Sequence, residues 1–471
     1  MATILDRIDL AGTRCNDGSL GAMYFSPAPL HAGMTVLHVH LEGGGYCYDQ
    51  ESCESPQHGD FMRSTRNRSG QIQKGGIFAR GPGAMPALAA AAHAYIAYCS
   101  SDSWTGNSTV LWSGRPWHFE GAQILATAVS TLLDQPRLRQ SALVLFSGCS
   151  AGGRGMLYNL DGLCDLVRAK VPSAKCAGLG DAAFWVDSVL TSEQDVQKVW
   201  ESALRRVALL GSQLWGGSSL SKSLNACRRN SFHPGPEFTA GASLGIGSPN
   251  ISTFDACLFG PALSPHVESP LLLAMQLNDH FQFDHLARGM HTIYIGGELG
   301  GPVSLPDMAV MGALRAKLTQ TLDQSVDEAR RTKENLRMVF APACFGHCVT
   351  EENSYYTIRL KNGAGEGLSL NDTVGMFVGG VLGWYQVSSQ AFIEEDQCRT
   401  LSCSTGCVPR KLWKAAAKAG VEYVALPFLA LCVCIRLACG RAKPKGQKGD
   451  TVTVYNEETP MSRPSYGSRR R

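Results

Sequence analysis

A short apolar strand that runs directly into a glycine-flanked serine constrains this 471-residue chain more than any other feature. Residues 142 to 153 read ALVLFSGCSAGG, which places Ser150 at the centre of a G-x-S-x-G motif. Small residues around the serine permit a sharp strand-to-helix turn that presents its hydroxyl above a sheet edge. The N-terminus of the following helix favours negative charge there. The motif predicts a nucleophilic Ser150, and a glycine-rich structural turn is the alternative.

Apolar runs of strand length alternate with helix-length segments over residues 1 to about 407. The strand candidates are Met34 to Leu41, Ala94 to Tyr98, Ala142 to Phe146, Leu271 to Met275 and Leu336 to Phe340. Phe119 to Leu133 and Met308 to Leu322 carry apolar residues at helical spacing. The alternation predicts an α/β fold with a doubly wound, mostly parallel sheet flanked by helices. Residues 212 to 270 are rich in Ser, Gly and Pro, and we interpret them as an insertion carrying loops.

The composition changes after Cys407. Residues 408–471 hold thirteen Lys and Arg against four Asp and Glu, so the body at 1–407 is acidic overall and shows no nucleic-acid-binding signature. We interpret 408–422 as a basic linker, 423–439 as a candidate transmembrane or membrane-associated helix, and 440–471 as a basic disordered tail. The charge-free run Tyr423 to Ile435 is shorter than the roughly 20 residues of a spanning helix. A span therefore requires Arg436 to reach the headgroups, and an interfacial or buried helix is the alternative.

A second glycine cluster follows the first strong strand, in the sequence HLEGGGYC at residues 40 to 47. Lipases and esterases place an HGGG-type loop at this position, where backbone N–H groups stabilise an oxyanion. We predict that the N–H groups of Gly44, Gly45 and Ala151 form such an oxyanion hole. A tight turn that ends a strand is the alternative.

The partners of a serine nucleophile are expected later in the chain, first an acid and then a histidine. Asp279 follows the apolar run Leu271 to Met275, and His347 follows Leu336 to Phe340. We predict that His347 accepts the Ser150 proton and that Asp279 orients the imidazole. This chemistry needs no metal and no cofactor. Spacing alone leaves competing candidates open, namely His280, His285, Asp284 and Asp181.

Six motifs in collinear order give residues 8 to 407 a resemblance to the pectin acetylesterase and Notum family of serine carboxylesterases. They are HLEGGGYCYDQESC at 40 to 53, YCSSDSWTG at 98 to 106, FEGAQIL at 119 to 125, SGCSAGGRGML at 147 to 157, PLLLAMQLNDHFQ at 270 to 282 and FAPACFGHC at 340 to 348. The resemblance implies an α/β-hydrolase-like fold with disulfide-stapled loops. It also implies a triad of Ser150, Asp279 and His347 with the oxyanion donors named above.

Two substrates are known within this family: acetyl groups on pectic polysaccharide, and the palmitoleoyl ester of Wnt proteins. YCYDQESCES and YCSSDSWTG are closer to Notum, whereas Gly45, where Notum has tryptophan, and the SGCSAGG turn are closer to the pectin acetylesterases. The expected substrate is therefore an O-acylated polysaccharide or an acylated protein, with the acyl length open. The alternative function is a catalytically silent cell-surface module that binds glycans or lipidated ligands in the same pocket. Candidates for an acyl pocket are Tyr46, Trp104, Phe184 and Trp185, although aromatic residues beside strand ends often belong to the core.

The seventeen cysteines favour an oxidising compartment, and hence a secreted or membrane-anchored protein. The first residues, MATILDRIDLAG, contain no apolar signal segment, so we expect either an earlier start or another route of export. Cys47 and Cys53 can bridge a short loop, and the family has a small disulfide there.

Further candidate pairs are Cys15 with Cys99, Cys164 with Cys176, and Cys227 with Cys257, although sequence does not prove connectivity. We expect the C-terminal cluster to pair internally and clamp the His347 loop; its members are Cys344, Cys348, Cys398, Cys403 and Cys407. A zinc site is the rival interpretation of this cluster. We interpret Cys149, beside the nucleophile, as a free buried thiol.

Overall fold

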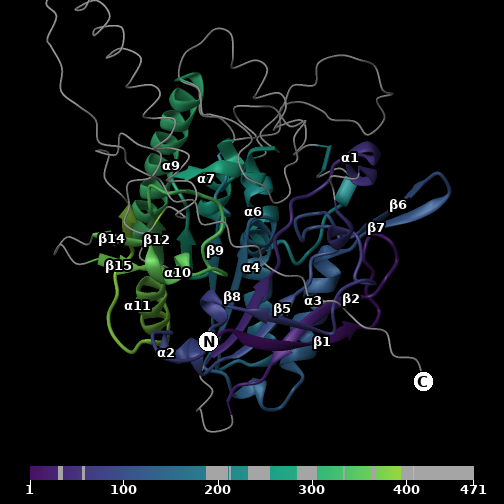
Figure 1. The fold of residues 1–471 in the computed structure, drawn as a ribbon, viewed down its shortest axis with the longest axis horizontal. Helices are drawn as coiled ribbons and strands as arrows, with labels where there is room; N and C mark the ends of the chain where they lie inside the picture. Colours follow the sequence, from purple (N-terminus) through teal and green to yellow (C-terminus); the bar gives the residue numbers. More distant parts are fainter. Residues whose placement is uncertain are drawn as a thin grey trace, which may run out of the picture. The chain divides into compact units, whose positions relative to one another are not determined.

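A ten-stranded sheet lies at the centre of the computed structural model (Figure 1). The structure describes residues 1–29, 36–55, 59–186, 210–211, 214–231, 255–283, 305–332, 335–361, 367–393 and 407. The strands of this sheet are β1 Thr3–Leu10, β2 Gly21–Ser26, β3 Val36–Leu41, β4 Gln71–Lys74, β5 Ala92–Ile96, β8 Leu143–Cys149, β9 Lys175–Asp181, β10 Leu271–Ala274, β12 Arg337–Ala341 and β16 Gln390–Ile393. Their order is β16-β12-β10-β9-β8-β3-β5-β2-β1-β4. The strands from β16 to β5 pair in parallel, and β2, β1 and β4 extend one edge antiparallel.

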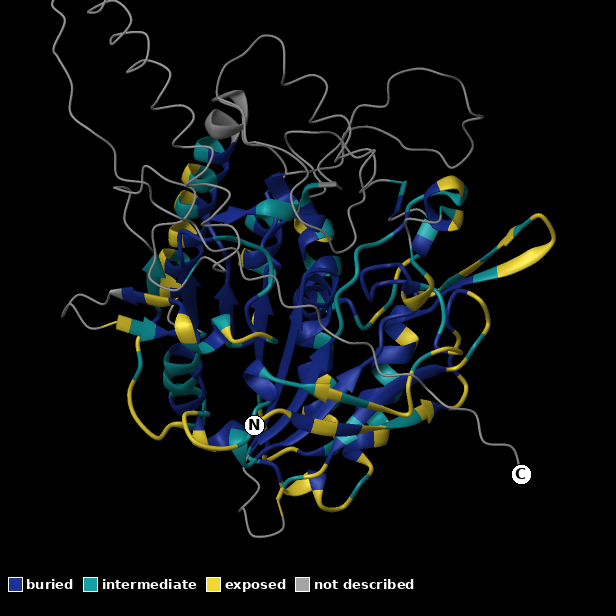
Figure 2. Ribbon diagram, viewed as in Figure 1, coloured by how far each residue is buried: buried dark blue, intermediate teal, exposed yellow. Residues whose placement is uncertain are grey.

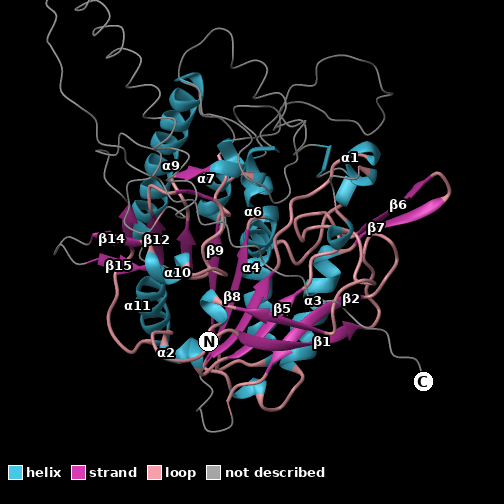
Figure 3. Cartoon of the chain, viewed as in Figure 1, coloured by secondary structure: helices cyan, strands magenta, loops and turns pink. Residues whose placement is uncertain are grey.

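Helices cover both faces of the sheet (Figure 3). They are α1 Gln50–Glu54, α2 Pro86–Ala89, α3 Gly121–Leu133, α4 Ala151–Lys170, α6 Lys222–Ser231, α7 Gly260–Leu263, α9 Leu305–Thr332, α10 Ser354–Thr357 and α11 Leu370–Leu382. Three short ladders stand apart from the main sheet: β6 Ser108–Trp112 with β7 Arg115–Phe119, β11 Asn278–Asp279 with β13 Phe345–Gly346, and β14 Arg359–Lys361 with β15 Gly367–Ser369. The β6–β7 hairpin extends away from the sheet, and its tip is exposed (Figure 2).

The central strands are buried on both faces, so their side chains feed two separate cores (Figure 2). On β3, Leu37 and Val39 belong to the core that includes α3 and α4. Their neighbour Val36 points to the opposite face, where Phe377 of α11 belongs to the second core. Burial of both faces explains why β10 and the first half of β8 are continuous apolar runs rather than alternating patterns.

The predicted fold class is confirmed, and each of the five predicted strands and both predicted helices is present with shifted ends. Strand β9, Lys175–Asp181, lies in the middle of the sheet but is not among the predicted strands. The insertion at 212–270 was interpreted as loops, but its described part contains α6, α7 and two short 3₁₀ helices.

Residues Met1–Leu412 form one compact unit. The predicted linker, apolar segment and tail at 408–471 lie outside the described residues. Within the described ranges, no helix combines the length and the apolarity that crossing a membrane requires.

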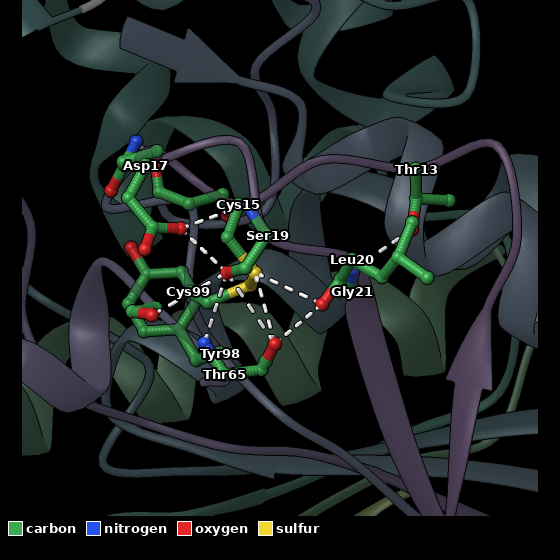
Figure 4. Close-up of a disulfide and its surroundings, with 12 residues drawn as sticks. Thr13, Cys15, Asp17, Ser19, Leu20, Gly21, Thr65, Tyr98 and Cys99 are labelled. Carbon is green, nitrogen blue, oxygen red and sulfur yellow. Dashed lines mark hydrogen bonds between the residues drawn. A yellow bond between two sulfur atoms is a disulfide. The ribbon is translucent and has the colours of Figure 1, made fainter. Parts of the chain in front are cut away.

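Six disulfides staple the described residues. All four pairs considered from the sequence are present, and they are Cys15–Cys99, Cys47–Cys53, Cys164–Cys176 and Cys227–Cys257. The other two are Cys149–Cys348 and Cys344–Cys407. Figure 4 shows the first pair, which joins the turn after β1 to the segment after β5. Hydrogen bonds reinforce this junction, because the Asn16 N–H donates to the Cys99 carbonyl at 2.9 Å.

Replacing Cys15 and Cys99 together by alanine is expected to lower the free energy of unfolding by about 2–4 kcal/mol. The bridge spans 84 residues of sequence, so its loss frees a long loop in the unfolded chain. Urea denaturation of the wild type and the double variant measures the difference. If the wild type has the same free energy of unfolding as the variant, and dithiothreitol does not change it, the Cys15–Cys99 bridge is not formed.

Candidate active site

The buried strand β8 ends at Cys149, and α4 begins at Ala151, so Ser150 alone forms the turn between them. Its backbone is held at φ 57° and ψ −123°, in a region that residues with a side chain rarely adopt. The Ser150 N–H donates to the carbonyl of Asp181 at 2.9 Å, and its carbonyl accepts the Arg154 N–H at 2.8 Å. The residue is 7% exposed and lies at the N-terminus of a 20-residue helix. Ser150 therefore occupies the kind of strained strand-to-helix turn that the sequence motif predicts.

The glycines of the motif are required by close backbone contacts. A Cβ on Gly148 would lie 2.4 Å from the carbonyl carbon of Gly152. A Cβ on Gly152 would lie 2.0 Å from the carbonyl oxygen of Leu41, at the end of β3. No side chain fits at either position, and so the spacing G-x-S-x-G follows from the packing of α4 against β8 and β3.

The glycine loop after β3 lies against the nucleophile turn. A Cβ on Gly43 would lie 2.5 Å from the carbonyl oxygen of Cys149 and 3.2 Å from the Cβ of Ser150. Gly45 has φ 88°, which a larger residue would adopt only with strain, and its carbonyl accepts the Tyr98 hydroxyl at 2.9 Å. The backbone of this loop is therefore beside Ser150, where the predicted oxyanion donors Gly44 and Gly45 are needed.

Asp279 and His347 form a direct pair. The Nδ1–H of His347 donates to the Asp279 carboxylate, with 3.0 Å to each oxygen. The pair is set by a two-residue parallel ladder in which Asp279 of β11 lies opposite Gly346 of β13. Asp279 is fully buried, and its Oδ1 also accepts the N–H groups of Phe281 at 2.9 Å and Gln282 at 3.1 Å. These bonds fix the carboxylate, and the carboxylate in turn fixes the tautomer of His347.

The second nitrogen of His347 is free for chemistry. Its Nε2 is buried and has no hydrogen-bond partner in the described structure. Phe281 stacks on the ring with centroids 4.9 Å apart, and His280 lies 5.7 Å away. Burial lowers the pKa of His347, but the charges of Asp279 and Asp181 and the bond to Asp279 outweigh it, so the pKa is raised above its ordinary value. An imidazole in this state is suited to accept a proton and to hold it briefly.

A disulfide joins the residue before Ser150 to the residue after His347. Cys149 and Cys348 are bridged, with Cα atoms 5.9 Å apart. The interpretation of Cys149 as a free thiol is therefore wrong, because a partner 199 residues away in sequence lies beside it in the fold. The C-terminal cysteines likewise do not pair wholly among themselves: Cys344 bonds Cys407, whereas Cys348 bonds Cys149. The remaining members, Cys398 and Cys403, lie outside the described residues.

The bridge also bears on the metal alternative. Donor atoms of Cys149, His347 and Cys348 lie within 4.8 Å of one another, a grouping that thiolates would make suitable for zinc. The disulfide leaves neither sulfur as a thiolate, so these residues do not fit a metal while it is intact.

Asp181 is a buried carboxylate that sequence spacing offered only as a competitor of Asp279. It ends β9, pairs with Cys149 across the sheet, and contacts the His347 loop rather than the imidazole nitrogens. Its Oδ2 accepts the N–H groups of Val349 and Thr350, each at 2.7 Å. Burial raises the pKa of Asp181 to about 6, although these bonds and the nearby His347 lower it. The other competitors His285 and Asp284 lie outside the described residues.

The four aromatic candidates for an acyl pocket occupy different places. Trp104 is a core residue: it is fully buried, packs on Tyr98 at 5.1 Å, and donates its indole N–H to the Glu42 carbonyl at 3.2 Å. Phe184 is also fully buried and packs against Gly260. Both side chains belong to the main hydrophobic core.

Tyr46 and Trp185 instead flank a buried arginine that the sequence analysis did not select. The guanidinium carbon of Arg154 lies 4.3 Å from the Trp185 ring centre and 5.1 Å from that of Tyr46. Its Nε donates to the Tyr158 hydroxyl at 2.9 Å, while one terminal nitrogen is buried without a partner. Trp185 also packs on Phe281 at 5.1 Å, which connects this cluster to the ring of His347. Arg154 follows Ser150 by four residues, about one helical turn. This spacing was the sequence signal that could have placed Arg154 on the same side of α4 as Ser150.

Known proteins are similar in sequence to this chain over much of its length. The pectinacetylesterase family model matches residues 1–234. The palmitoleoyl-protein carboxylesterase NOTUM of Schmidtea mediterranea is 26% identical over 351 residues, covering 74% of this chain and 58% of that protein. The human protein of the same name is 27% identical over 351 residues, covering 74% and 61%. The chain thus spans about three fifths of the length of these relatives.

The structure is similar to that of the Wnt deacylase Notum from Drosophila. The TM-score is 0.64 at 23% sequence identity, with 86% of this chain and 100% of that chain covered. This similarity confirms the predicted α/β-hydrolase-like fold. The family model over residues 1–234 and the relatives over 74% of the chain together support its assignment to the pectin acetylesterase and Notum family.

Proposed function

We propose that this chain is a serine ester hydrolase that removes O-acyl groups through an acyl-enzyme on Ser150. The observation that carries the proposal is the Asp279–His347 pair, whose loop is bonded to the nucleophile turn through Cys149–Cys348. The names of the relatives describe carboxylesterases, which supports the same class of reaction.

The reaction assigns one task to each group. The Ser150 hydroxyl attacks the ester carbonyl carbon while Nε2 of His347 takes its proton, and Asp279 stabilises the imidazolium. The N–H groups of Gly44, Gly45 and Ala151 stabilise the oxyanion. Collapse breaks the bond to the alcohol, which leaves with the proton from His347. Water then attacks the acyl-enzyme with His347 again as base, and the carboxylic acid is released.

The cluster around Arg154 favours a short acyl group. We propose that Tyr46 and Trp185 line the acyl site, which places a buried guanidinium in its wall. The unpartnered terminal nitrogen of this cation requires a hydrogen-bond acceptor, which the oxygen atoms of a short ester and its alcohol can supply and a long alkyl chain cannot. An acetyl group leaves room for the polar alcohol or water there. Acetylated polysaccharide is therefore the favoured substrate over a fatty-acylated protein.

A comparison of p-nitrophenyl acetate with p-nitrophenyl octanoate tests this proposal. We expect kcat/KM for the acetate to exceed that for the octanoate at least about tenfold, since the longer chain meets a charged wall. Arg154→Met should shift the ratio toward the octanoate. A fluorophosphonate probe should label the wild type at Ser150, as only an activated serine reacts. Octanoate preference would point to a fatty-acyl pocket, whereas absent labelling and turnover would support the silent ligand-binding module.

We propose an extracellular or secretory location. Six disulfides among the described residues support it, because such bridges persist in oxidising compartments. Association with a membrane through 423–439 remains a prediction from the sequence.

A further inference from the structure

We propose that Asp181 is a positioning residue of the active site, whose carboxylate holds the histidine loop, residues His347 to Thr350, against the nucleophile turn. This inference rests on the proposed ester hydrolysis at Ser150. Asp181 is distinct from the triad acid, because the carboxylate bonded to the imidazole is that of Asp279.

Asp181 contacts both halves of the site at once. Its backbone carbonyl accepts the N–H of Ser150 at 2.9 Å. Its carboxylate Oδ2 accepts three hydrogen bonds from the histidine loop, namely the Val349 N–H, the Thr350 N–H and the Thr350 hydroxyl, each at 2.7 Å. The nucleophile and the base come from segments about 200 residues apart, and Asp181 connects them through one residue. A carboxylate that accepts several N–H and O–H bonds is a strong anchor for a loop.

The position of Asp181 in the sheet makes this anchor rigid. It pairs with Cys149 of β8 on one side and with Ala274 of β10 on the other. It is fully buried, and a Cβ on Gly153 would lie 2.7 Å from its carbonyl oxygen. Movement of Asp181 would disturb β8, β9 and β10. The histidine loop is therefore anchored to a buried part of the sheet.

The charge of Asp181 also acts on the catalytic imidazole. Its Oδ1 is buried and has no hydrogen-bond partner in the described structure, so no hydrogen bond replaces the hydration that this oxygen lost on burial. The groups that face His347 are the carboxylates of Asp279 and Asp181 and the ring of His280. Both carboxylates favour the protonated imidazole, the form that His347 takes during attack by the serine. A residue that only filled space would not have this electrostatic effect.

Two substitutions separate the anchor from the charge. Asp181→Asn keeps an oxygen that can accept the loop N–H groups but removes the charge. Its kcat/KM profile should shift to lower pH on the acidic limb, because His347 then loses its proton more easily. Asp181→Ala removes the acceptor as well, and kcat should fall roughly 10- to 100-fold, the effect of a misplaced catalytic group.

Asp161 is the matched control. It is a buried carboxylate of α4 that also accepts loop hydrogen bonds, from the N–H groups of Glu268 at 3.1 Å and Ser269 at 2.9 Å. Asp161→Asn and Asp161→Ala should destabilise the fold while leaving kcat and the pH profile unchanged. If the Asp181 variants behave like the Asp161 variants, the proposal is wrong.

The titration of His347 by NMR separates failure of this inference from failure of the proposed function. The imidazole resonances report its pKa in wild type and Asp181→Asn whether or not the protein turns over an ester. A lower pKa in Asp181→Asn, with loss of amide protection at Val349 and Thr350 in Asp181→Ala, supports the positioning role even in an inactive protein. Unchanged values in both variants overturn it even in an active one.

Discussion

Replacing Ser150 by alanine is expected to lower kcat by about 10⁶-fold, the loss measured when a serine hydrolase is deprived of its nucleophile. The alanine cannot form the acyl-enzyme, while the glycine loop after β3 and the Asp279–His347 pair stay in place. Serine and alanine both carry a Cβ and meet the same backbone strain at φ 57°, and only the hydroxyl is lost. The melting temperature should therefore change by no more than a few degrees. Steady-state hydrolysis of p-nitrophenyl acetate and a thermal melt measure the two quantities.

Ser147 provides a matched control on the same strand. Its hydroxyl lies 2.7 Å from Nε2 of His38 and 2.8 Å from Nδ1 of His40, and it is fully buried. Ser147→Ala should lower the free energy of unfolding by roughly 1–3 kcal/mol, because buried imidazole nitrogens lose a partner, yet turnover should persist. An active Ser150→Ala protein would refute the proposed mechanism, and equal activity losses in both variants would show a structural effect.

The nucleophile turn could be predicted because its requirements are local. Steric contact at positions 148 and 152 requires glycine at both. The motif can therefore be recognised from five consecutive residues. The order of acid and histidine left several candidates open, and the family resemblance pointed to Asp279 and His347. The structure brings these two side chains together. Their juxtaposition depends on a ladder of only two residues per strand, β11 with β13, which leaves no periodic pattern in the sequence.

The features that could not be predicted depend on tertiary packing. Strand β9 reads KCAGLGD, in which glycines stand where strand formers are expected. A Cβ on Gly178 would lie 2.6 Å from the sulfur of Met156, so the close approach of α4 to the sheet removes the side chain there. With the strand unrecognised, Asp181 at its end could not be placed beside the histidine loop. Arg154 was missed because nothing in the sequence marks a guanidinium that packs between two aromatic rings.

The disulfide Cys149–Cys348 is expected to support both stability and catalysis. Its half-cystines are 199 residues apart in sequence, so replacing both by alanine should lower the free energy of unfolding by about 2–5 kcal/mol. The same change removes the covalent link between the histidine loop and the nucleophile turn, so that the hydrogen bonds to Asp181 remain to connect these two segments. We therefore expect kcat to fall roughly 100-fold, since small displacements of a catalytic base are costly. Urea denaturation and ester hydrolysis measure the two effects.

The bridge Cys164–Cys176 is the appropriate control, because it joins α4 to β9 with a sequence separation of 12. Its removal should cost less stability, since it closes a much shorter loop in the unfolded chain, and kcat should be retained. The contrast distinguishes a catalytic role from a general loss of stability. A Cys149→Ala, Cys348→Ala protein with wild-type kcat would show that the loop stays in place without the bridge, as the hydrogen bonds that Asp181 accepts would allow. The activity of Asp181→Ala, in which the disulfide is intact, would then show how far the disulfide alone holds the histidine loop in place.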